Sequence, residues 1–145
     1  MPGICAVVEL KANRKAASGL HRMLQSMRHY SWYACQSYQS NDGRAAIGLV
    51  SSSPTNSNLQ QAVSADGLLA VMLHGEVYDT KDVEEALRSA GVRLEKASQA
   101  ELLLHGYERI GRVFFERLNG RFVAVIWDGS NNRLVVVNDR FGTKP

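Results

Sequence analysis

Four short runs of apolar residues constrain the fold of this chain more than any other feature of its sequence. They show no alternation with polar residues, and they lie at 4–8, 68–73, 122–127 and 134–137. A strand that is apolar on both faces has to be covered on both faces, so these runs predict sheets buried between other layers. None approaches the roughly 20 residues that cross a bilayer, and no charged leader opens the chain, so we expect a cytoplasmic protein without membrane contact.

Three helices are expected between these strands. Apolar residues recur at three- and four-residue spacing over 14–29, which predicts a helix with one buried stripe. A second helix is expected to begin at Asp79 or Thr80, either of which is a suitable N-cap. Ser98 and Glu101 form the Ser-x-x-Glu pattern of a capping box, which predicts the start of a third helix.

Turn residues divide the remaining segments into hairpins. Asp42-Gly43 separates strand-like stretches at 32–38 and 44–50, and the polar residues 128–132 separate the last two apolar runs. A polar loop is expected over 51–58. The predicted order is strand, helix, hairpin, strand, helix, helix, hairpin, which favours an α+β fold of stacked sheets with helical outer layers.

Composition excludes several classes of function. A chain of 145 residues predicts one domain, and a net charge of +3 gives little reason to expect nucleic-acid binding. The two cysteines and four histidines lack the spacing of metal ligands. We therefore expect no metal site, no disulfide and no cofactor in this domain.

Five segments, taken in order, carry a resemblance to a known family: Met1–Ile4, His74–Tyr78, Ala100–Tyr107, Leu118–Phe122 and Asn138–Pro145. The chain resembles the glutaminase domain of asparagine synthetase and other class II glutamine amidotransferases. The resemblance covers nearly the whole of 1–145. It implies an N-terminal nucleophile hydrolase-like, four-layer αββα sandwich, followed in the parent protein by a synthetase domain that uses ATP. Because Pro145 falls inside the last motif, the chain is expected to be the N-terminal part of a longer protein.

The resemblance also shows where the family's nucleophile is replaced. The family uses a cysteine that directly follows the initiator methionine, and the matching residue here is Pro2. A thiol is required for this acyl transfer, so we expect no intact catalytic residue. Cys5 is expected on the opposite face of the strand as a core residue. Two alternatives stay open: Cys35 near His29 as a substitute nucleophile, and the secondary amine of an N-terminal Pro2.

Other positions of the implied pocket are also changed. Ser51 stands where the family has an arginine that binds the carboxylate of glutamine, and Gln99 stands where it has an aspartate that binds the amino group. His74 replaces an asparagine that stabilises the oxyanion, although the simpler interpretation is a strand-ending residue with locally satisfied polar atoms. Gly75 would supply the second oxyanion donor, and Glu76 matches the family. These five residues form the vestigial pocket that the resemblance implies.

Three functions follow from these observations. The first is a catalytically degenerate glutaminase-like domain, inactive by itself, that has a structural or ligand-binding role beside a synthetase module. The second is a protein-interaction module, because a cluster of Tyr30, Trp32, Tyr33 and Tyr38 lies where the family has an Arg-Gly-Pro-Asp stretch. The third is an active glutamine amidotransferase that releases ammonia for asparagine synthesis. A small amino-acid-like ligand and a homodimer stay open in each case.

Overall fold

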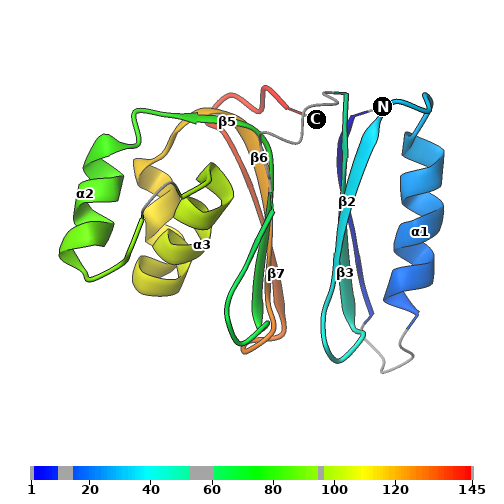
Figure 1. Cartoon of the computed structure of the whole chain (residues 1–145), viewed down its shortest axis with the longest axis horizontal. Coiled ribbons are helices and arrows are strands. Elements are labelled where there is room, and N and C mark those ends of the chain that lie inside the picture. The colour runs from blue at the N-terminus through cyan, green and yellow to red at the C-terminus, as the bar shows by residue number, and fades with distance from the viewer. Residues whose placement is uncertain (1, 10–14, 53–60, 95–96, 145) are drawn as a thin grey trace.

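The computed structural model describes residues 2–9, 15–52, 61–94 and 97–144, and these form four layers. Figure 1 shows helix α1 on one outer side, two sheets in the middle, and helices α2 and α3 on the other outer side. The predicted αββα sandwich is therefore confirmed.

The first sheet contains β1 (Gly3–Val8), β2 (Ala34–Gln39) and β3 (Ala45–Ser51) in the antiparallel order β1-β3-β2. The predicted turn joins β2 to β3, and the Asp42 carboxylate accepts hydrogen bonds from the Ser40 hydroxyl at 2.6 Å and the Arg44 amide at 3.0 Å. The start of β2 was predicted two residues too early. Trp32 and Tyr33 lie before the strand, in a turn that follows α1.

The second sheet contains β4 (Gln61–Val63), β5 (Leu69–Tyr78), β6 (Asn119–Asp128) and β7 (Arg133–Asn138), in that order. Strands β5 and β6 pair over their full length, from Leu69 opposite Asp128 to Tyr78 opposite Asn119. Both strands are longer than the sequence patterns predicted. His74 lies inside β5 and does not end it, and Asn119-Gly120, expected as a turn, opens β6. Strand β4 was not predicted, because three residues are too few to establish a period.

Helices cover the outer faces of both sheets. Helix α1 (Ala16–Met27) packs on the first sheet, and α2 (Lys81–Ser89) and α3 (Gln99–Ile110) lie on the outer side of the second. A 3-10 helix, η1 (Gly111–Arg117), follows α3 and was not predicted. Thr80 precedes α2, but its hydroxyl donates to the Glu84 carboxylate at 2.7 Å and does not cap a backbone amide. Parts of the predicted first helix and of the loop over 51–58 lie outside the described residues.

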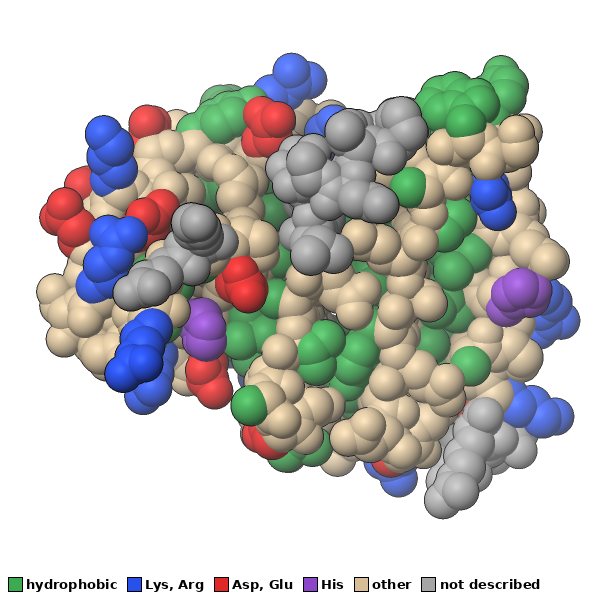
Figure 2. All heavy atoms as spheres, in the orientation of Figure 1, with side chains coloured by type: hydrophobic (Ala, Val, Ile, Leu, Met, Phe, Trp, Pro, Cys, Tyr) green, Lys and Arg blue, Asp and Glu red, His purple; other side chains and the backbone are tan. Residues whose placement is uncertain are grey.

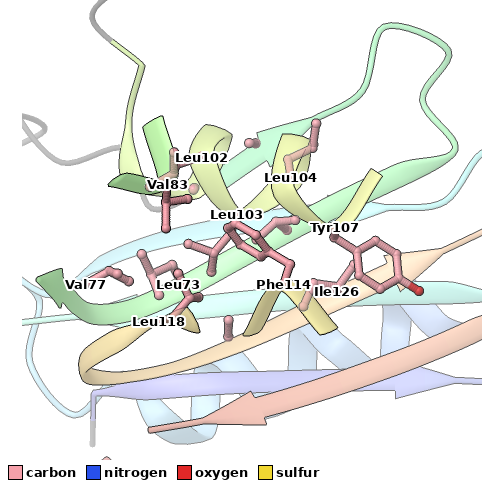
Figure 3. Packing of buried hydrophobic residues seen from close by; sticks show 14 of the residues in the cluster. Leu73, Val77, Val83, Leu102, Leu103, Leu104, Tyr107, Phe114, Leu118 and Ile126 are labelled. Carbon is pink, nitrogen blue, oxygen red and sulfur yellow. The ribbon is translucent and has the colours of Figure 1, made fainter. Parts of the chain in front are cut away.

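Three apolar layers hold the sandwich together. The layer between the sheets includes Ile47, Leu49, Met72, Val125 and Trp127. A larger layer between the second sheet and its helices is drawn in Figure 3, where Leu73 and Ile126 face Leu103 and Phe114. The third layer packs Cys5 and Ala46 against Ala16 and Leu20 of α1. No helix in the described parts of the chain is long and apolar enough to cross a membrane.

Candidate functional site

The start of β1 and the end of β3 bring two of the predicted site residues together. Gly3 pairs with Val50, so Pro2, which directly precedes β1, and Ser51, which ends β3, lie at the same end of this sheet. Ser51 also pairs with Ala34 of β2. Ile4 and Ala6 pack in the layer between the sheets. Because side chains alternate along a strand, Pro2 belongs to the same face, which is directed toward the second sheet.

His74 approaches this region from the second sheet. Ala70 and Met72 pack between the sheets, so alternation along β5 directs His74 to the same space. Burial lowers the pKa of His74, and the nearby Lys144 ammonium lowers it further, so its imidazole is neutral at pH 7. Its ring finds no hydrogen-bond partner among the described residues, so local satisfaction of its polar atoms is not observed there. Sequence patterns gave no sign that Lys144 lies near His74.

Gly75 is required by the close approach of β5 and β6. Its φ is +111°, a conformation that residues with a side chain rarely adopt. A Cβ atom at this position would overlap the carbonyl oxygen of Arg121 and lie 2.9 Å from the Cα of Phe122. The fold alone therefore accounts for glycine at this position. The neighbouring Glu76 side chain is exposed.

Gln99 is directed at the backbone of β5. Its Oε1 accepts a hydrogen bond from the amide of Val77 at 3.0 Å, and its Nε2 donates to the carbonyl of Val77 at 2.8 Å. Gln99 is the first residue of α3 and directly follows the N-cap Ser98. The predicted capping box is confirmed, since Glu101 and Ser98 exchange hydrogen bonds of 2.6 and 3.2 Å.

Asp139 anchors the segment that leads to Lys144. Its buried carboxylate accepts hydrogen bonds from the Phe122 amide at 3.1 Å, the Phe141 amide at 2.9 Å, and both the hydroxyl and the amide of Thr143. The bond from the Thr143 hydroxyl is the largest cause of a lowered pKa at Asp139. The expected turn at 139–142 is confirmed, since the Gly142 amide donates to the Asp139 carbonyl at 3.0 Å. Asp139 is an anchor as expected, but packing by Phe141 was predicted wrongly, because its side chain is 87% exposed. The sequence did not predict that this anchored segment brings Lys144 near His74.

The two cysteines lie on the opposite face of the first sheet from Pro2. Cys5 is 6% exposed and packs against α1, and burial raises the pKa of its thiol. Cys35 pairs with Val50 in the register and is exposed. Among the described residues, Cys35 and His29 share no hydrogen bond. The structure therefore brings neither thiol to the face that holds Pro2.

The aromatic cluster forms with three of its four predicted members. The ring centroids of Tyr30 and Trp32 lie 5.6 Å apart and those of Trp32 and Tyr33 4.6 Å apart. Tyr30 and Trp32 are 57% and 53% exposed. Including Tyr38 was wrong, because it packs between the sheets and donates its hydroxyl hydrogen bond to the Gly67 carbonyl at 3.0 Å.

A cavity of about 390 Å³ lies at the other end of β5 and β6. It is lined by Leu69 and Asp128, which pair at that end, and by Tyr107, Arg112 and Arg133. Burial would raise the pKa of Asp128, but hydrogen bonds from Asn131 and Tyr107 outweigh it and the pKa is lowered. None of the predicted pocket residues lines this cavity. Within the described residues, no group of three or more His, Cys, Asp or Glu side chains could hold a metal ion.

Comparison with known families agrees with this architecture. The family model described as "glutamine amidotransferase domain" matches residues 1–145. The chain belongs to this family of glutamine amidotransferase domains.

Similar curated proteins are much longer than this chain. Asparagine synthetase [glutamine-hydrolyzing] 3 of Bacillus subtilis (strain 168) is 37% identical over 75 residues, which are 52% of this chain and 12% of that protein. Asparagine synthetase [glutamine-hydrolyzing] 3 of Arabidopsis thaliana is 29% identical over 148 residues, which cover 100% of this chain and 25% of the relative. The chain therefore spans a quarter or less of these relatives.

One solved structure shows a weaker likeness. It is glutamine phosphoribosylpyrophosphate (PRPP) amidotransferase from B. subtilis complexed with ADP and GMP. The two proteins are 22% identical, the match covers 60% of this chain and 22% of that chain, and the TM-score is 0.47. This partial likeness adds nothing to the family assignment.

Proposed function

We propose that this chain is a glutamine amidotransferase domain that does not hydrolyse glutamine. The observation that carries the proposal is the placement of Pro2. Pro2 directly precedes β1, and alternation along that strand assigns it to the face directed toward His74, while Cys5 and Cys35 belong to the other face of the same sheet. Acyl transfer from glutamine needs a nucleophile in the site, and a proline side chain has none.

The remaining pocket positions support the same proposal. Ser51 has no charge with which to bind a carboxylate, and the Gln99 amide is directed at Val77. A charged contact with a buried carboxylate is worth about 2–5 kcal/mol, so its loss greatly weakens selection of glutamine. His74 still offers a neutral hydrogen-bond donor to the space between the sheets.

The domain has its role, in this proposal, beside a synthetase module that uses ATP. Two observations support this arrangement: the relatives are asparagine synthetases, and the chain matches 12% and 25% of the lengths of the two relatives described above. The domain would then contribute packing or a ligand site, with no cofactor of its own. A cytoplasmic location is part of the same proposal.

The test is glutamate release from millimolar glutamine by the purified chain, measured beside a Pro2→Cys variant from which Met1 has been removed. We expect no release above a heat-denatured control from either protein. Release by Pro2→Cys alone would show that proline is the only defect and would contradict the loss of the pocket. Release by the parent chain would overturn the proposal and direct attention to Cys5 and Cys35.

A second candidate function is an interaction module. It is favoured by the exposure of Tyr30 and Trp32, two large rings stacked at 5.6 Å in a loop where an unpartnered domain gains nothing from exposing them. Figure 2 shows hydrophobic side chains gathered at the upper right, over the C-terminal end of α1. This function predicts that acrylamide quenching of Trp32 fluorescence falls when the longer parent protein is compared with the isolated domain. Equal quenching in both would argue against it.

A further inference from the structure

We propose that Gln99 is a positioning residue for the candidate site: its amide substitutes for a neighbouring strand at Val77 and fixes the end of β5 to the start of α3. The proposal concerns the shape of the site and holds whether or not the domain hydrolyses glutamine. It assigns Gln99 a role different from the ligand-binding one that the family resemblance implies.

One edge of β5 is only partly covered by a neighbouring strand within the described residues. Strand β4 pairs with β5 only from Ala70 to Met72, and among the described residues no strand pairs with that edge beyond Met72. The amide and carbonyl of Val77 both bond to Gln99, so they point away from β6. A buried peptide group without partners is costly, and Val77 is 3% exposed. Gln99 supplies both partners.

The carboxamide of Gln99 suits both hydrogen-bonding groups of the Val77 backbone. A peptide group offers one donor and one acceptor, and at pH 7 a carboxamide side chain returns an acceptor and a donor from one planar group, which an ionised carboxylate cannot do. An aspartate or glutamate at position 99 would accept from the Val77 amide but place a second acceptor against the Val77 carbonyl. Replacing the amide with a carboxylate therefore breaks half of this pairing.

The hydrogen bonds between Gln99 and Val77 lie close to Gly75 of the candidate site. Val77 is two residues from Gly75, whose φ of +111° brings β5 into close approach to β6. On the other strand of the pair, Asp139 binds Phe122 in the same manner, since the carboxylate accepts from the Phe122 amide and the Asp139 amide donates to the Phe122 carbonyl at 2.9 Å. Phe122 pairs with Gly75. Asp139 thus holds β6 opposite Gly75, and Gln99 holds β5 two residues further along the strand.

The experiment exploits the chemistry of a Gln99→Glu variant. At pH 7 the glutamate is ionised and repels the Val77 carbonyl, so we expect the melting temperature to fall by about 5 °C relative to the parent chain. Once protonated, its carboxyl group donates to that carbonyl and restores both bonds. The folded-state pKa is raised, so stability returns as the pH falls through it. We expect the difference in melting temperature between Gln99→Glu and the parent chain to shrink by more than half at pH 4.

Two control variants separate this role from packing. Gln99→Ala should show a deficit that does not depend on pH, and Gln25→Glu, which adds the same charge on an exposed position of α1, should show almost none. A pH-independent deficit for Gln99→Glu, equal to that of Gln99→Ala, would overturn the proposal.

Amide hydrogen exchange provides a second measurement that does not depend on the glutamate variant folding at pH 7. We expect the Val77 amide to be protected in the parent chain and to exchange at least about 10-fold faster in Gln99→Ala. The amide of Val71, which lies opposite Ala62 of β4, serves as the internal reference. Equal acceleration at Val77 and Val71 would show only global destabilisation and would contradict a specific role for Gln99.

Discussion

The two sheets differ in how they build the candidate site. On the second sheet, Gly75, Gln99 and Asp139 each have a structural cause: a close strand approach, a strand-edge pairing and a loop anchor. On the first sheet, Pro2 and the exposed loop of Tyr30 and Trp32 have no comparable cause in the described contacts. The positions on the second sheet that match the family are therefore explained by the fold alone, and their presence is no evidence of activity.

The largest expected effect tests the structural half of this comparison. Gly75→Ala should destabilise the chain by more than about 4 kcal/mol, because the new Cβ overlaps the Arg121 carbonyl oxygen. Chemical denaturation measures the loss. Gly91→Ala is the matched control, since Gly91 also has a positive φ of +83° but no atom within 4 Å of the added Cβ, and should cost about 1 kcal/mol. Similar losses in the two variants would refute the close approach.

Asp139→Asn should have the next largest effect, and that effect should depend on pH. The lowered pKa of Asp139 means that the carboxylate stabilises the fold fully above its unfolded pKa of about 3.9. This stabilisation is lost as the pH falls through the lower folded value. The difference in melting temperature between the parent and Asp139→Asn should therefore be large at pH 7 and shrink in acid.

The exposed Asp82 provides a control for this prediction. Asp82→Asn removes the same charge without removing a buried hydrogen-bond network and should change the melting temperature much less. If the difference in melting temperature between the parent and Asp139→Asn were constant from pH 7 to pH 3, the ionised carboxylate would not be what stabilises this segment.

Thiol labelling sharpens the other half of the comparison. In the folded chain, Cys35 should react with iodoacetamide while Cys5 does not, because Cys5 is buried and burial raises its pKa. Intact mass should show one adduct in the parent and in Cys5→Ser, and none in Cys35→Ser. Rapid modification of Cys5 in the native state would reveal an accessible thiol that the structure does not provide.

The smallest expected effect falls on the exposed aromatic loop. Trp32→Ala should change the free energy of unfolding by about 0.5 kcal/mol, since the side chain is 53% exposed and packs mainly on two neighbouring rings. The buried Trp127, 2% exposed, is the matched comparison, and Trp127→Ala should cost about 3–5 kcal/mol. A large loss of unfolding free energy for Trp32→Ala would show that this loop stabilises the fold.

Local patterns in the sequence favoured stacked sheets with helical outer layers, and the family resemblance implied the four-layer arrangement. Apolar runs indicated the buried strands, and Ser98 and Glu101 indicated the start of α3 correctly. Strand ends were less accurate, since β5 continues through the polar residues His74 to Tyr78. That extension depends on pairing with β6, a contact between distant segments that no local pattern records.

The sequence predicted which residues belong to the candidate site but not which contacts they make. Alternation along β1 correctly separated Cys5 from Pro2, because strand period is a local property. The approach of Lys144 to His74 and the bonds from Gln99 to Val77 arise from tertiary contacts across the chain. A Gln at the first position of a helix gives no sequence signal that its amide will replace a strand.

The most direct test of the central claim is covalent labelling by a diazoketone analogue of glutamine, read by intact mass. We predict no adduct whose formation excess glutamine prevents, because neither Cys5 nor Cys35 lies on the face of the first sheet to which Pro2 belongs. A stoichiometric adduct on Cys5 or Cys35 that glutamine blocks would contradict it and show a working glutamine site.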